Sequence, residues 1–121
     1  MAEQYSSFQR GGTRWVLQRL TAVFLIGVLA FHFMLLHFVN HAADITFLGT
    51  QARMSQVGYF ATMWLFLVTA TFHGVNGVYN ALINMGLEGS RKRAVGGVLA
   101  LAGLLLILQG TRVAIAMTNL L

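Results

Sequence analysis

The chain has 121 residues, of which 57% are hydrophobic and only 9% are charged, and this composition predicts a membrane protein rather than a soluble domain. It contains no cysteine and no proline, which excludes a disulfide scaffold, a thiolate metal site and a haem attached through cysteines. The net charge is +5, but the basic residues lie at the ends of apolar runs, so no nucleic-acid partner is expected.

Three long uncharged runs of apolar residues predict the fold. Each run reaches or exceeds the roughly 18 residues that a membrane-spanning helix needs. We therefore expect a single all-α membrane domain over residues 1–121 with three transmembrane helices. The predicted spans are about 14–39, 57–84 and 94–119.

Lysine and arginine in the short flanks of the spans predict how the chain crosses the membrane, because flanks rich in these residues stay cytoplasmic. Most of them precede the first span or lie between the second and third: Arg10, Arg14, Arg19, Arg91, Lys92 and Arg93. The first loop has only Arg53, and Arg112 lies near the end of the third span. We expect a cytoplasmic amino terminus, an external carboxyl terminus and a multi-pass location in the cell membrane. The first run is too long for a signal-peptide core and is expected to be retained.

The amino-terminal part is polar and carries a Gly11-Gly12 pair, so we expect residues 1–12 to form an extended cytoplasmic lead. Thr13 is then the expected N-cap of the first span, and Trp15 an anchor at the membrane interface. Arg19 lies about one helical turn inside the cytoplasmic boundary. It either extends its side chain to the headgroups, or binds an anionic group such as a haem propionate, or polarises a quinone carbonyl.

Histidines follow along the first span and the first loop. His32 shares one helical face with Gln18, Ala22, Leu25 and Leu29. His37 lies on a different face and is spaced i, i+4 from His41. No carboxylate or third histidine accompanies that pair at helical spacing, so we interpret both as interfacial histidines rather than metal ligands. Residues 50–56 of the loop are expected to form a short interfacial helix.

A polar stripe crosses the second span. His73, Asn76, Gly77, Asn80 and Asn84 fall on one helical face. A histidine near the middle of a bilayer is unfavourable against lipid, so this face is expected to point into a helical bundle.

The surroundings of His73 suggest how its ring is used. Gly74 and Gly77 remove side-chain bulk where a flat group could lie against the backbone. Thr69, one turn earlier, could accept a hydrogen bond from the second ring nitrogen of His73 and so set its tautomer.

The third span is expected to serve packing. Gly86 and Gly89 are predicted to end the second helix, and Arg91 to Arg93 mark the cytoplasmic surface. Beyond them, small residues recur on one side of the third helix, which is typical of a close helix–helix contact. They are Gly96, Ala100, Gly103, Gly110 and Ala114.

The depths of the two buried histidines differ. His32 lies past the middle of its span toward the outside, and His73 lies past the middle of its span toward the cytoplasm, which separates the rings by about 10 Å along the membrane normal. One haem cannot easily take both as axial ligands. Each would need a partner histidine from another chain, which predicts a heteromer or a homodimer sharing up to two haems. The alternative is a pair of hydrogen-bonded histidines inside a bundle without haem.

Two segments resemble a known family. The first is the stretch from Trp15 to Ala22 (WVLQRLTA) with His32 fourteen residues after Gln18, and the second is the stretch from Phe72 to Gly77 (FHGVNG). Together they resemble the small membrane-anchor subunits of succinate dehydrogenase, of the type that binds haem b, and archaeal anchors in particular. The resemblance covers nearly the whole chain.

The resemblance implies residue roles. His73 matches the histidine that ligates the haem nearer the cytoplasm, and His32 matches the ligand of the outer haem in two-haem members. Asn76 and Gly77 would lie beside the cofactor with them. The family's Arg-x-Ser/Thr pattern, here Arg19 with Thr21, lies near the cytoplasmic quinone site in some members.

The chain departs from the family in one respect. An Asp-Tyr pair that helps bind quinone in some members reads Asn84-Met85 here, so that role is not carried over. Trp15 and Tyr79 are the other candidates for a quinone contact.

The resemblance also implies partners. This chain would perform no succinate chemistry itself and would pack with a second anchor subunit as a helical bundle, with an iron–sulfur subunit and a flavoprotein with covalent FAD docked on them. The cofactors would be one or two haems b shared with the second anchor, and quinone in the surrounding lipid would be the substrate.

Other interpretations stay open. A haem-free structural anchor of the same complex would keep its histidines for packing, and a small multi-pass adaptor would have no redox role. A transporter is disfavoured because no acidic residue or proline interrupts the spans. A self-contained cytochrome with two haems would need His37 or His41 as additional ligands.

Overall fold

The computed structural model describes residues 2–118, with side chains from residue 12 onward, and is all-helical within that range. The long helices are α1 (Ala2–Met34), α3 (Val57–Asn84) and α4 (Gly89–Ala116), and α2 (Phe47–Met54) is a short helix in the first loop. Three of its helical segments are long and apolar enough to cross a membrane, namely Gly12–Val39, Val57–Asn84 and Gly89–Ala116. The chain is a multi-pass membrane protein, as the sequence predicts.

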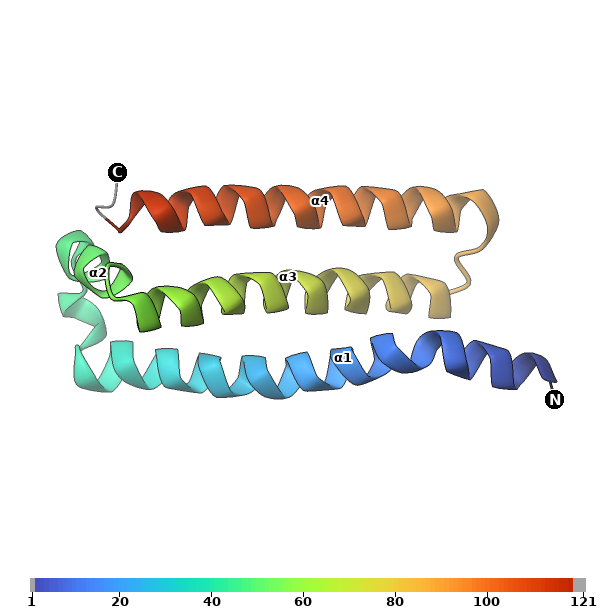
Figure 1. The fold of residues 1–121 in the computed structure, drawn as a ribbon, viewed down its shortest axis with the longest axis horizontal. Coiled ribbons are helices and arrows are strands. Elements are labelled where there is room, and N and C mark those ends of the chain that lie inside the picture. Colours follow the sequence, from blue (N-terminus) through green and yellow to red (C-terminus); the bar gives the residue numbers. More distant parts are fainter. Residues whose placement is uncertain (1, 119–121) are drawn as a thin grey trace.

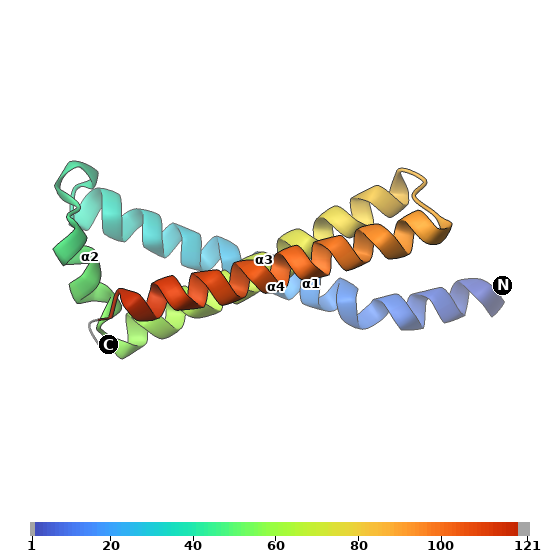
Figure 2. The same ribbon diagram turned by 90° about the horizontal axis from the view of Figure 1, so that it is seen from above.

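Helix α3 is central. It packs against α1 on one side and α4 on the other (Figure 1). Seen from above, α1 crosses the α3–α4 pair, so that α1 diverges from the pair toward both ends of the molecule (Figure 2). We call the end where α1 begins, α3 ends and α4 begins the basic end, because Arg14, Arg19 and the cluster from Arg91 to Arg93 belong to it.

The amino-terminal prediction is wrong. Helix α1 begins at Ala2 and runs through Gly11, Gly12 and Thr13, so residues 2–12 are helical and Thr13 is not an N-cap. Each glycine destabilises a helix interior by only about 1 kcal/mol, and with no proline nearby the helix continues through the pair. At its other end α1 passes at Met34 into a π-helical turn, Leu35–Val39, so the helical path still ends at the predicted residue.

The first loop differs from the prediction in register. Helix α2 spans Phe47–Met54 rather than 50–56, because the Thr46 hydroxyl caps it by accepting a hydrogen bond from the Gly49 amide at 3.1 Å. The loop is tied to the turn just after α4 by the Ser55 hydroxyl, which donates to the Thr118 carbonyl at 2.9 Å.

The bounds of α3 agree with the prediction, whereas α4 starts earlier than predicted. Gly86 adopts a left-handed φ of +93° just beyond α3, which is the expected way for a helix to end. Gly89, with a φ of +63°, is instead the first residue of α4, so the cluster Arg91 to Arg93 is helical. The predicted end of this span at 119 lies outside the described residues.

The small residues of α4 form the predicted packing face. A Cβ atom built on Gly96 would lie 3.2 Å from the Tyr79 ring, and one on Gly103 would lie 3.1 Å from a Val75 methyl group. A Cβ on Gly110 would overlap the end of the Leu67 side chain. These three glycines therefore bring α4 close to α3. The pair is also joined by the Trp64 indole, which donates to the Thr111 hydroxyl at 3.0 Å.

We expect Gly103→Leu to destabilise the fold by about 1–3 kcal/mol, because the added side chain meets the stiff β-branched groups of Val75 and Thr71. The matched control is Gly97→Leu on the same helix, where a built Cβ meets nothing within 4 Å. Thermal denaturation of the purified protein measures the effect. Equal midpoints for the two variants would show that the α3–α4 contact does not depend on Gly103.

Candidate functional site

His73 lies on α3 and faces α1. Its Nδ1 is 3.1 Å from the Thr21 hydroxyl oxygen, and the ring is half-buried. Its Nε2 makes no hydrogen bond to any residue that the structure describes. One ring nitrogen is therefore held by the neighbouring helix while the other has no partner in the described part of the chain, which is the arrangement that metal-ligating histidines adopt.

Gln18 of α1 joins the two helices beside His73. Its side-chain amide donates to the His73 carbonyl at 3.1 Å, and its Oε1 accepts from the Asn76 amide at 2.8 Å. Asn76 is only 7% exposed. Hydrogen bonds of this kind connect helices in a membrane, where unpaired polar groups are unfavourable. Gln18 thus fixes which residues of α1 and α3 lie opposite each other beside His73.

The two glycines next to His73 have different surroundings. A Cβ on Gly77 would lie 3.3 Å from the Gln18 amide nitrogen, so Gly77 makes room for Gln18. A Cβ on Gly74 would meet nothing within 4 Å, and Gly74 is exposed. Within this chain, the bare surface expected for a flat group is found at Gly74.

The predicted role of Thr69 is wrong. Its hydroxyl donates to the Leu65 carbonyl of its own helix at 2.6 Å, and Thr21 of α1 holds the His73 ring nitrogen instead. The sequence places Thr69 one turn from His73, but the ring points across to α1. The missed residue, Thr21, lies three positions after Gln18, hence on the same side of α1.

His32 lies elsewhere along the same pair of helices. It lines a cavity of about 240 Å³ together with Val28 and Leu29 of α1 and Met63 and Phe66 of α3. Its Nδ1 is buried and has no hydrogen-bond partner among residues 12–118. Met63 and Phe66 precede His73 by ten and seven residues, so His32 lies about 10–15 Å from the level of His73 along α3. Two histidines therefore lie along the α1–α3 contact at separate depths.

The other two histidines have different environments. His37 is exposed, stacks on the Phe33 ring at 4.2 Å and bonds through Nδ1 to the Phe33 carbonyl of its own helix at 3.2 Å. His41 is exposed in the loop after α1. Neither lines a described cavity with residues of a second long helix.

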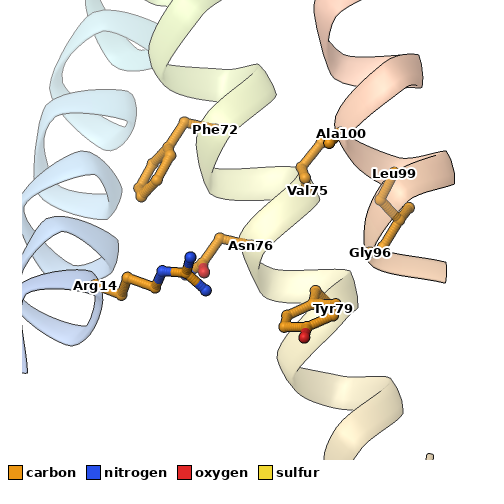
Figure 3. Close-up of a pocket in the computed structure, with 8 residues that line it drawn as sticks. All are labelled: Arg14, Phe72, Val75, Asn76, Tyr79, Gly96, Leu99 and Ala100. Carbon is orange, nitrogen blue, oxygen red and sulfur yellow. The ribbon is translucent and has the colours of Figure 1, made fainter. Parts of the chain in front are cut away.

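A groove of about 360 Å³ opens between the three long helices toward the basic end (Figure 3). Arg14 of α1 extends its guanidinium toward it, and Tyr79 of α3 presents its hydroxyl at one end. The other lining residues are mostly apolar or small: Phe72, Val75, Asn76, Gly96, Leu99 and Ala100. The groove thus combines an apolar wall with a cation, an amide and a phenol.

The three residues predicted as quinone contacts lie in two places. Tyr79 lines this groove. Arg19 and Trp15 do not line it, and the Arg19 guanidinium lies over the Trp15 ring at 4.4 Å. Arg14, and not Arg19, is the arginine that lines this groove. Its one signal in the sequence is its spacing of four residues before Gln18, which puts both on one side of α1.

Comparison with known proteins gives two matches. The model of the family described as "Succinate dehydrogenase/Fumarate reductase transmembrane subunit" matches residues 2–110. The succinate dehydrogenase hydrophobic membrane anchor subunit of Archaeoglobus fulgidus is 28% identical over 96 residues, which cover 79% of this chain and 81% of that protein. No solved structure matches the chain.

Proposed function

This chain belongs to the succinate dehydrogenase/fumarate reductase transmembrane subunit family, and on that premise we propose that it binds haem b together with a second anchor subunit. In this proposal it helps electrons pass from an iron–sulfur subunit to membrane quinone. The flavoprotein that oxidises succinate would be another subunit, and this chain would hold no site for succinate.

The observation that carries the proposal is the environment of His73. Thr21 holds Nδ1, Gln18 holds the backbone carbonyl, Nε2 has no partner among the described residues, and the neighbouring Gly74 surface is bare. These surroundings fit a histidine that would hold haem iron. His32, with a buried Nδ1 that lacks a partner and a cavity beside it, fits a second ligand at another depth.

Few apolar side chains of this chain are covered by the chain itself. Among residues 12–118, Val28 is the one large apolar side chain that is buried. A layer of three helices with exposed apolar faces supports packing against a second anchor subunit and lipid. That subunit would supply a further histidine to hold each haem. The basic end would be cytoplasmic by the distribution of arginine and lysine.

When bound, haem b supplies the one-electron redox chemistry that side chains lack. The residues of this chain have three tasks. His73 and His32 would hold the haem iron through ring nitrogens, Thr21 and Gln18 would orient the His73 segment, and the apolar spans would exclude water. Arg19 lies in the sequence between Gln18 and Thr21, which contact His73, and its guanidinium lies over the Trp15 ring. It would bind a haem propionate.

Succinate-dependent reduction tests the proposal. Addition of succinate to the purified complex is expected to produce the reduced-minus-oxidised absorbance of haem b. A complex that contains flavin and iron–sulfur clusters but gives no haem absorbance would contradict haem binding and favour a structural anchor. A chain that purifies without such subunits would favour an adaptor.

We also propose that the groove between Arg14 and Tyr79 receives the quinone headgroup. Its apolar wall suits the ring and tail, while the phenol and the guanidinium can donate hydrogen bonds to quinone carbonyls. It lies toward the basic end, where the iron–sulfur subunit would dock.

Tyr79→Phe is expected to raise the KM for quinone about 2- to 10-fold, the effect of losing one hydrogen bond worth about 0.5–1.5 kcal/mol. Arg14→Gln should act in the same direction. Arg112→Gln is the control, since Arg112 is exposed near the far end of α4 and lies outside the groove. Steady-state quinone reduction with haem content held constant measures these effects. A raised KM in Arg19→Gln alone would assign the quinone to the surface of Trp15 and Arg19.

A further inference from the structure

The Thr21 hydroxyl contacts two kinds of group. Its oxygen is 2.7 Å from the Leu17 carbonyl, 3.1 Å from the Gln18 carbonyl and 3.1 Å from His73 Nδ1. A hydroxyl has one proton to donate, and a carbonyl can only accept. Two oxygens at 2.7 Å repel each other unless a proton lies between them. The Thr21 proton is therefore directed to Leu17, and the hydroxyl oxygen accepts from His73.

The direction of these hydrogen bonds determines the tautomer of the His73 ring. If Thr21 accepts from Nδ1, the proton of the neutral imidazole is on Nδ1, and the lone pair is on Nε2. Nε2 is the nitrogen without a partner among the described residues. The ligating nitrogen is thus prepared before any metal binds.

We propose that Thr21 is a positioning residue that sets the tautomer, the orientation and the basicity of His73. The inference rests on the proposed haem function and adds a residue on a different helix from the ligand. Because Thr21 donates its own proton to Leu17, its oxygen is a stronger acceptor. A strong acceptor at Nδ1 makes Nε2 more basic, which stabilises the oxidised iron of a bound haem.

The test compares four complexes: wild type, Thr21→Val, Thr21→Ser and Thr69→Val. Valine keeps the shape of threonine and lacks the hydroxyl, while serine keeps the hydroxyl. Thr69→Val is the matched control because Thr69 makes the same bond to its own helix, at 2.6 Å to the Leu65 carbonyl. The readouts are the haem-to-flavin ratio after prolonged detergent washing and the midpoint potential of the haem by redox titration.

Thr21→Val is expected to raise the midpoint potential and to weaken haem binding about 10- to 100-fold, the usual effect of losing a partner of a ligating histidine. Thr21→Ser should restore both values, and Thr69→Val should resemble wild type. Equal potentials in Thr21→Val and wild type would overturn the inference. If Thr21→Val does not assemble, the pair Thr21→Ala and Thr21→Ser gives the same comparison, with equal potentials again counting against it.

The outcome is separable from that of the haem proposal. If His73→Ala retains its full haem content, the haem proposal itself is wrong. If His73→Ala loses haem while Thr21→Val keeps the wild-type potential and affinity, only the role of Thr21 is wrong.

Discussion

His73→Ala is expected to remove one haem b, so that the reduced α-band absorbance per flavin falls to about half in a two-haem complex. The substitution deletes the ring nitrogen that has no partner among the described residues. The other half-buried histidine, His32 of α1, lies at a level about 10–15 Å away, measured along α3, and cannot replace it. Flavin content measured on the same sample reports whether the complex has assembled.

His37→Ala is the control for that experiment. It makes the same chemical change at an exposed histidine whose Nδ1 bonds to its own helix. Wild-type absorbance is expected for this variant. Unchanged absorbance in His73→Ala, with loss in His37→Ala, would mean that the ligand has been assigned to the wrong helix.

The second large effect is expected for His32→Ala, which should remove the other haem and leave the one at His73. The His32 Nδ1 is buried and has no hydrogen-bond partner among the described residues, and a cavity of about 240 Å³ lies beside the ring. His32 therefore has both a nitrogen that could bind a metal and room for a ligand at this depth. Redox titration should then give one haem component in place of two, since each site has its own potential.

His41→Ala is the control here, because His41 is exposed and lines no described cavity. If His32→Ala retains both redox components, His32 is not a haem ligand and serves only in packing. Loss of a component in the double variant of His37 and His41, but not in His32→Ala, would support the alternative ligands considered from the sequence.

The long helices could be predicted from the sequence because hydropathy over a span is a sum of many residues. The bounds of α3, Val57–Asn84, follow from the apolar run alone. The start of α1 could not be predicted in this way. Whether a helix continues through Gly11 and Gly12 depends on a small difference in free energy between helix and coil that composition does not resolve.

The histidine positions and their difference in depth could also be predicted, since both depend only on rise per residue. The partners of those histidines could not. Periodicity indicates which residues share a face of one helix, so it suggests Thr69 for the His73 ring, whereas a quinone contact of Arg19 is implied by the family resemblance and stays a prediction. The structure instead has Thr21 at the ring and Arg14 at the groove, because those contacts depend on how α1 crosses α3 (Figure 2).

The most direct test of haem binding at two depths is the molar ratio of haem b to flavin in the wild-type complex. A pyridine haemochrome assay and a flavin assay on one sample provide it. Ligation at both His73 and His32 predicts a ratio of about two. A ratio near zero in a complex with full flavin content would contradict the central claim that this chain is a haem-binding anchor.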